Sequence, residues 1–87
     1  MNRHNLGRFT LPAIMVDNRP EEVAQVFALL KCVPIRCENM AYNRSFDYMA
    51  ISERFDEIKP GMEIPWYQLE ITANDGQVES VEVVPLP

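Results

Sequence analysis

The chain has 87 residues, a hydrophobic fraction of 47% and a net charge of −5. This length allows one domain core, and the apolar fraction excludes a disordered polymer. No apolar run approaches the ~20 residues of a membrane span. The segment 1–9 (MNRHNLGRF) lacks the apolar stretch of a signal peptide, so we expect a cytoplasmic protein.

Charge is unevenly distributed along the chain. Residues 1–54 hold seven basic and six acidic side chains, whereas residues 55–87 hold one basic and seven acidic side chains. A negative C-terminal third repels nucleic acid and anionic lipid and attracts basic protein surfaces. Solubility alone is the other explanation of this acidity.

The N-terminal part is predicted to be a flexible tail followed by a strand. Residues 1–8 are polar without a period, so we expect a tail there and a single domain over residues 9–87. The segment 9–16 (FTLPAIMV) is apolar and β-branched, which favours a strand. Pro12 cannot donate to a ladder and therefore indicates a sheet edge or a bulge.

One main helix is predicted after this strand. Asn18 is a candidate N-cap with Glu21 as its capping-box partner, and the helix should end before Pro34. Apolar residues spaced i, i+3, i+4, i+7 predict a single buried stripe. This stripe consists of Val23, Val26, Phe27 and Leu30.

Four further strands are predicted, over residues 35–40, 46–52, 65–73 and 78–84. The last two flank Asn74-Asp75-Gly76, a sequence typical of a tight hairpin. Leu69 and Ile71 should then meet Val83 and Val81 on one face, with Glu70 and Glu82 on the other. The order β-α-β-β-β-β predicts an α+β fold with a single antiparallel sheet of about five strands and one main helix packed on it.

The sequence offers no recognisable catalytic or cofactor site. It contains no phosphate-binding glycine loop and no nucleophile elbow, and neither cysteine has an identifiable base. Cys32 and Cys37 are expected to be small buried residues, because a zinc site would find only His4 as a further good ligand. We therefore expect a binding protein that is not an enzyme, needs no cofactor or metal, and does not bind nucleic acid directly. Trp66 and Tyr67 should serve in packing.

Several segments resemble, in order and spacing, the uracil-DNA glycosylase inhibitors of bacterial viruses. They are PEEVAQV (20–26), AYN (41–43), YMAIS (48–52) and PWYQLEITANDG (65–76), and the similarity covers roughly residues 14–84. Members of that family imitate DNA. Carboxylates replace phosphates in the basic cleft of the enzyme, and an apolar pocket between helix and sheet receives the side chain that the enzyme inserts into the minor groove.

The resemblance implies two sets of partner-binding residues. Glu21 and Glu22 at the helix start, together with Asp17, would be the phosphate-like charges. The apolar pocket would be lined by Met15, Val23, Val26, Phe27, Met49 and Ile51. The implied partner is a host uracil-DNA glycosylase in the host cytoplasm. A helix N-terminus that favours acidic residues and an ordinary core explain the same two sets without a partner.

Two alternatives remain open at this stage. The same inhibitory role could be directed at another host nucleic-acid enzyme or defence complex that has a basic surface. A non-enzymatic structural or assembly subunit, which pairs through an exposed edge strand, is the alternative from a different class.

Overall fold

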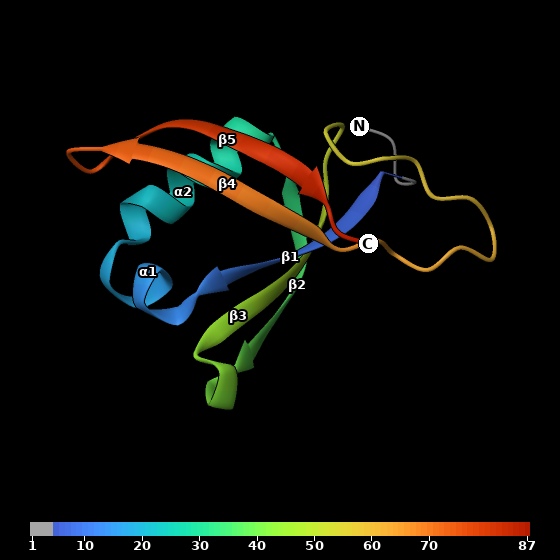
Figure 1. Ribbon diagram of the computed structural model, residues 1–87, viewed down its shortest axis with the longest axis horizontal. Coiled ribbons are helices and arrows are strands. Elements are labelled where there is room, and N and C mark those ends of the chain that lie inside the picture. The colour runs from blue at the N-terminus through green and yellow to red at the C-terminus, as the bar shows by residue number, and fades with distance from the viewer. Residues whose placement is uncertain (1–4) are drawn as a thin grey trace.

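The computed structural model describes residues 5–87, which form an α+β domain with five strands and one main helix (Figure 1). The predicted class and the order of the main elements are confirmed, with a short additional helix and a 3₁₀ turn. The elements are β1 (Leu6–Pro12), α1 (Ala13–Asn18), α2 (Pro20–Leu30), β2 (Val33–Met40), η1 (Ala41–Asn43), β3 (Ser45–Ile51), β4 (Tyr67–Asn74) and β5 (Gln77–Pro85).

The five strands form two antiparallel sheets and not the single sheet expected from the sequence. One sheet has the order β1-β3-β2 and the other is the β4–β5 hairpin. They meet at a parallel bridge between Arg8 and Trp66, where the Arg8 N–H donates to the Pro65 carbonyl at 2.9 Å. Beyond this bridge the hairpin leaves β1, and side-chain hydrogen bonds from Gln25 join its far end to α2.

The strand predicted over residues 9–16 is half wrong. β1 ends at Pro12, opposite Ser45, which is the first residue of its partner strand. Ala13–Asn18 therefore has no strand to pair with, and it turns into α1. The Ala13 N–H donates to the Arg44 carbonyl at 2.8 Å, so the β-branched residues of this segment follow tertiary context and not their strand propensity. The prediction that Pro12 belongs to an edge strand is confirmed.

Helix α2 begins differently from the prediction. Asn18 is the last residue of α1, so it cannot cap α2; the N-cap is Arg19, which makes no side-chain cap hydrogen bond. Pro20 occupies the first turn, where its missing N–H costs nothing. The helix ends at Leu30, and Lys31 adopts the left-handed conformation with φ of 50°.

The core lies where α2 packs against both sheets. From the helix, Val23, Val26 and Leu30 are buried and Phe27 is half-buried, which confirms the predicted stripe. The remaining buried apolar residues come from the strands, the 52–66 loop and α1. These are Phe9, Leu11, Met15, Tyr48, Ala50, Phe55, Tyr67, Val78 and Val81.

The β4–β5 hairpin has the predicted pairing. Leu69 lies opposite Val83, and Ile71 opposite Val81. The turn places Asp75 at φ of 52° and Gly76 at 78°, the two consecutive positive values that a two-residue hairpin turn of this hand requires.

The expectation of a flexible tail over residues 1–8 is wrong for residues 6–8. Leu6–Arg8 pairs with β3 as part of β1. Gly7 is buried there, and a Cβ at this position would lie 2.7 Å from the Phe55 ring. The strand can pass beneath this ring only because residue 7 has no side chain. Residues 1–4, including His4, lie outside the described part of the chain.

Candidate protein-binding surfaces

The three predicted charge residues lie near one another but are not equally available. Asp17 in α1 and Glu21 in the first turn of α2 are exposed. Glu22 is only 7% exposed, and its Oε2 lies 3.5 Å from Nε of Arg19. Because Glu22 is already covered and paired, Asp17 and Glu21 are the charges that a partner can reach.

The tip of the hairpin lies beside these acids and extends the same surface. The Gln25 side chain accepts a hydrogen bond from the Val78 N–H at 2.7 Å and donates one to the Gly76 carbonyl at 3.3 Å. One open hollow is lined by residues 73–76 of the hairpin turn and, near the helix start, by Asn18, Arg19, Glu21 and Glu22. Asp75 therefore joins Glu21 at one site. No local pattern predicts this contact, because Gln25 lies 51 residues from Gly76.

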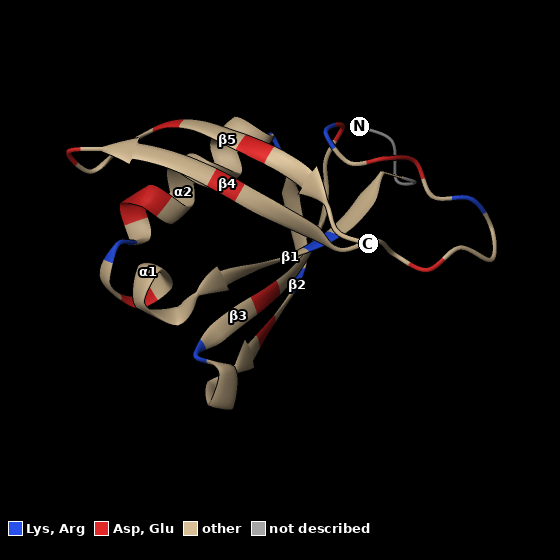
Figure 2. Ribbon diagram, viewed as in Figure 1, with Lys and Arg blue, Asp and Glu red and all other residues tan. Residues whose placement is uncertain are grey.

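The outer face of the hairpin continues the acidic surface (Figure 2). Glu70 and Glu82 lie directly opposite each other on β4 and β5, and both are exposed. No Lys or Arg occurs from residue 60 to residue 87. Like charges placed opposite each other in a sheet destabilise it, so this pair costs stability that no neighbouring cation in the segment offsets.

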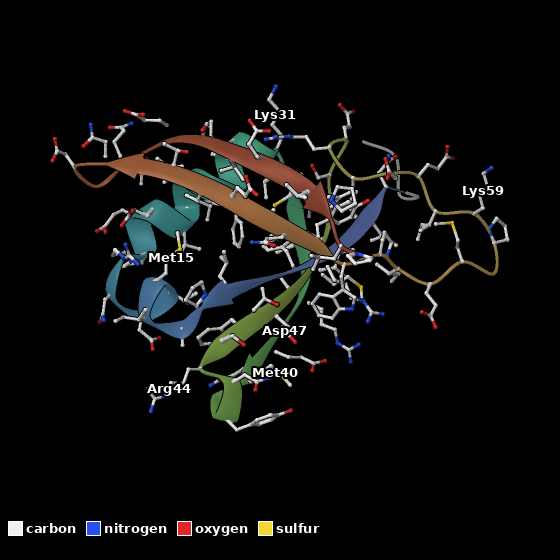
Figure 3. The ribbon with its side chains drawn as sticks, in the orientation of Figure 1. Met15, Lys31, Met40, Arg44, Asp47 and Lys59 are labelled. Carbon is white, nitrogen blue, oxygen red and sulfur yellow. The ribbon has the colours of Figure 1, made fainter. Side chains whose placement is uncertain are left out.

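The six predicted pocket residues do not line one pocket. Met15, Val23, Val26 and Phe27 belong to the core between α2 and the sheets. Figure 3 shows Met15 beside α1 and α2. Met49 and Ile51 are half-buried on the opposite face of the three-stranded sheet, because the alternation along β3 directs Tyr48 and Ala50 toward the helix. The resemblance implied that Met49, the methionine of YMAIS, lines the pocket. In the structure Met49 lies on the other face of β3, so this expectation is wrong.

Aromatic rings fill the space between α2 and β3. Phe9 stacks on Tyr48 with centroids 5.4 Å apart, and Phe27 meets the edge of Tyr48 at 5.2 Å. Phe9 and Phe27 also meet edge to face at 6.1 Å. An incoming side chain could enter here only by displacing this cluster.

The outer face of the three-stranded sheet carries a second, smaller feature. The Arg8 guanidinium lies 5.6 Å from the centre of the Trp66 ring, and its Nε is buried with no hydrogen-bond partner among the described residues. The adjoining hollow, of about 130 Å³, is lined by Arg8, Arg36, Glu38, Asp47, Tyr48, Met49 and Trp66. Its charges are balanced and its volume is below that of typical small-molecule sites. Trp66 is 37% exposed, so it packs only partly, whereas Tyr67 packs fully.

The two cysteines are free thiols, and their expected burial is wrong for Cys37. Cys32 is half-buried, and this burial raises the pKa of its thiol. Cys37 is exposed because it lies on β2, an edge strand that α2 does not cover. Burial, and secondly a hydrogen bond with Cys37, raises the pKa of the Tyr48 hydroxyl to about 12.

Within residues 5–87, no group of three or more His, Cys, Asp and Glu side chains is arranged to hold a metal ion. No helix in the same range is long and apolar enough to cross a membrane. A scan against protein-family models and searches of curated proteins and of solved structures return no match for this chain.

Proposed function

We propose that this chain is a protein inhibitor that binds in the DNA-binding cleft of a uracil-DNA glycosylase and acts in the host cytoplasm. The observation that carries the proposal is the acidic surface formed by α1, the start of α2 and the β4–β5 hairpin, in which Arg19 is an exposed cation between Asp17 and Glu21. Its exposed carboxylates are Asp17, Glu21, Glu70, Asp75, Glu79 and Glu82. The order of the motifs along the chain, which resembles the glycosylase inhibitors, names the target.

The charge arrangement suits a protein that competes with DNA. A basic cleft attracts a row of carboxylates as it attracts phosphates, and this raises the association rate. The same row repels DNA itself, so the inhibitor does not sequester the substrate. Gln25 fixes the hairpin tip relative to α2, so Glu21 and Asp75 are held in place before the partner arrives, which lowers the entropic cost of binding.

Slow dissociation requires apolar contact in addition to charge, and α1 supplies it. Ile14 is 63% exposed and lies one helical turn before Asp17, so the two side chains share a face. Both residues line an open hollow between α1 and η1, together with Ala13, Asn18, Asn39, Ala41 and Arg44. The apolar part of the interface is therefore assigned to this hollow and not to the filled space between α2 and β3.

A uracil-excision assay tests the proposal. Purified bacterial uracil-DNA glycosylase is titrated with the chain on a uracil-containing duplex, and binding of the chain to the duplex alone is measured in parallel. Complete loss of excision near a one-to-one ratio, without binding to DNA, is the expected result. Full activity at large excess would remove this enzyme as the target.

Matched variants locate the interface. Glu21→Lys changes an exposed acid of the proposed surface, whereas Glu57→Lys makes the same charge change in the 52–66 loop. This loop carries Lys59 at the opposite end of the molecule from the hairpin tip (Figure 3). Glu21→Lys should slow association several-fold at low salt, with a smaller difference at high salt, while Glu57→Lys should change it little. Equal effects of both variants would indicate attraction by net charge alone.

The filled space between α2 and β3 favours a second candidate. An enzyme that holds DNA through phosphates alone, such as another host nuclease or polymerase, needs no pocket for an inserted side chain. If the glycosylase retains full activity, an immobilised chain and its Glu21→Lys variant should be compared for retention of purified DNA-binding enzymes. The immobilised wild-type chain should retain a target of this kind, and the Glu21→Lys variant should not.

A further inference from the structure

Strand β2 presents an open backbone edge. It is the outer strand of the β1-β3-β2 sheet, on the side away from β1, and β1 in turn contacts the hairpin. Within residues 5–87, no backbone hydrogen bond outside the sheet ladder involves Val33–Met40. Val33 and Ile35 on this strand are 52% and 53% exposed. Pro34 and a register shift between Pro34 and Arg36 interrupt the first part of this edge, so the regular open edge runs over residues 36–40, where another strand can pair.

The outer edge of β5, in contrast, is covered by side chains of the same chain. Gln25 accepts from the Val78 N–H, and Nη2 of Arg54 donates to the Val81 carbonyl at 2.6 Å. The described residues thus place two side-chain hydrogen bonds on the edge of β5 and none on the edge of β2, so β2 is open to a strand from outside the chain.

The charges on β2 favour antiparallel pairing with a second copy of the same strand, and they favour one register of that pairing. When two copies of one strand pair antiparallel about a two-fold axis, one residue lies opposite its own copy. No other register is possible, because the backbone N–H and C=O groups point outward only at alternate residues. Centring on Arg36 places two arginines opposite each other, and centring on Glu38 does the same for two glutamates. Centring on Cys37 places Arg36 of each copy opposite Glu38 of the other, which is favourable.

We propose that two copies of this chain pair antiparallel through β2, with the two-fold axis at Cys37, and so join their three-stranded sheets into one of six strands. Within each monomer Nε of Arg36 already lies 3.5 Å from Oε1 of Glu38, so both side chains extend over the same face of the strand. In the dimer each arginine exchanges this neighbour for the partner's carboxylate. The acidic surface on α1, α2 and the hairpin remains uncovered, so the dimer presents it twice.

Charge exchange tests the interface. Sedimentation of the wild-type chain over a range of concentrations should show a monomer–dimer equilibrium. Arg36→Glu should raise the dimer dissociation constant by about tenfold or more, since two attractive pairs become repulsive. The double variant Arg36→Glu/Glu38→Arg restores opposite charges and should return the constant to within about threefold of wild type. Circular dichroism checks that each variant is folded.

A covalent trap tests the register without altering any charge. Directly opposed residues of antiparallel strands have Cα atoms about 4.5–5.5 Å apart, within the range that a disulfide spans. Diamide should therefore oxidise two Cys37 thiols to an intermolecular disulfide as it is itself reduced to the hydrazine. Cys32→Ser should leave this cross-link intact, and Cys37→Ser should abolish it.

Several outcomes would overturn the proposal. A chain that sediments as a monomer at every concentration has no such interface. A dimer that is unaffected by Arg36→Glu, or whose diamide cross-link persists in Cys37→Ser, pairs elsewhere. A folded double variant that stays monomeric excludes the Cys37-centred register. None of these results depends on whether the chain inhibits a glycosylase, because excision is not measured.

Discussion

Gln25 is the residue on which the position of the hairpin tip depends most directly. Its side chain makes two hydrogen bonds to the backbone of residues 76 and 78, and Val78 is buried. Removing the amide leaves the Val78 N–H without its acceptor, and a buried unsatisfied donor costs about 1–3 kcal/mol. We predict that Gln25→Ala lowers the free energy of unfolding by this amount, as measured by urea denaturation.

Gln68→Ala is the matched control for this prediction. Gln68 is exposed on β4, so its truncation should change the free energy of unfolding by less than about 0.5 kcal/mol. Equal losses from the two variants would mean that the amide of Gln25 does not hold the hairpin tip.

Tyr48 gives the fold a defined sensitivity to alkaline pH. In the folded state its pKa is raised from 10.0 to about 12, chiefly by burial and then by the hydrogen bond with Cys37. The unfolded chain therefore releases this proton at lower pH than the folded chain does. Stability from this group is complete below pH ~10 and is lost as the pH rises from there through ~12.

We predict that Tyr48→Phe removes this part of the pH dependence. The phenylalanine variant keeps the ring that stacks on Phe9 but has no proton to lose. Thermal unfolding of the two proteins between neutral pH and about pH 11 measures the difference. Curves that fall in parallel over this range would show that other groups cause the alkaline loss.

At the scale of elements, the C-terminus of α2 carries a strained residue. Lys31 adopts φ of 50°, and the left-handed conformation costs a residue with a Cβ roughly 1–2 kcal/mol. Lys31→Gly should therefore raise the free energy of unfolding by about 0.5–1 kcal/mol, after the greater flexibility of unfolded glycine is subtracted. Lys59 has no positive φ, so Lys59→Gly should not stabilise. Comparable gains from both variants would contradict strain relief.

Sequence predicted those elements whose signals are local. The apolar stripe of α2 and the pairing of Leu69 with Val83 follow from the periods 3.6 and 2 and from one tight turn. The end of β1 at Pro12 and the start of α1 could not be predicted from local patterns, because they depend on where the distant β3 begins. The same limit applies to the split into two sheets, because the packing of the hairpin on α2 joins segments that are far apart in the sequence.

The candidate site shows the same division. The exposed charges Asp17 and Glu21 were among the residues that the resemblance implied, whereas Glu22, implied with them, is buried and paired with Arg19. The face on which Met49 lies was not predicted. A shift of one residue along a strand moves every side chain to the other face of the sheet, and the five-residue motif YMAIS does not determine which residues face the helix. Asp75 was missed as a neighbour of Glu21 because only the folded chain brings them together.

At the scale of the whole molecule, negative charge is concentrated on the hairpin at the expense of stability. Glu70 and Glu82 face each other across the hairpin, in a segment of 28 residues (60–87) without a single Lys or Arg. We predict that Glu70→Lys raises the free energy of unfolding by about 0.2–1 kcal/mol, because a repulsive cross-strand pair becomes attractive. The same change should slow association with the glycosylase, because a cation then interrupts the row of carboxylates.

Opposite signs for stability and binding are the distinctive part of this prediction. Urea denaturation measures the first, and stopped-flow association at low and high salt measures the second. Glu57→Lys makes the same change in net charge in the 52–66 loop and has no opposed glutamate in either sheet, so it should neither stabilise the fold nor slow association comparably. If Glu70→Lys stabilises the fold and leaves association unchanged, the hairpin face lies outside the interface, and the acidic surface contracts to α1, the start of α2 and the hairpin tip.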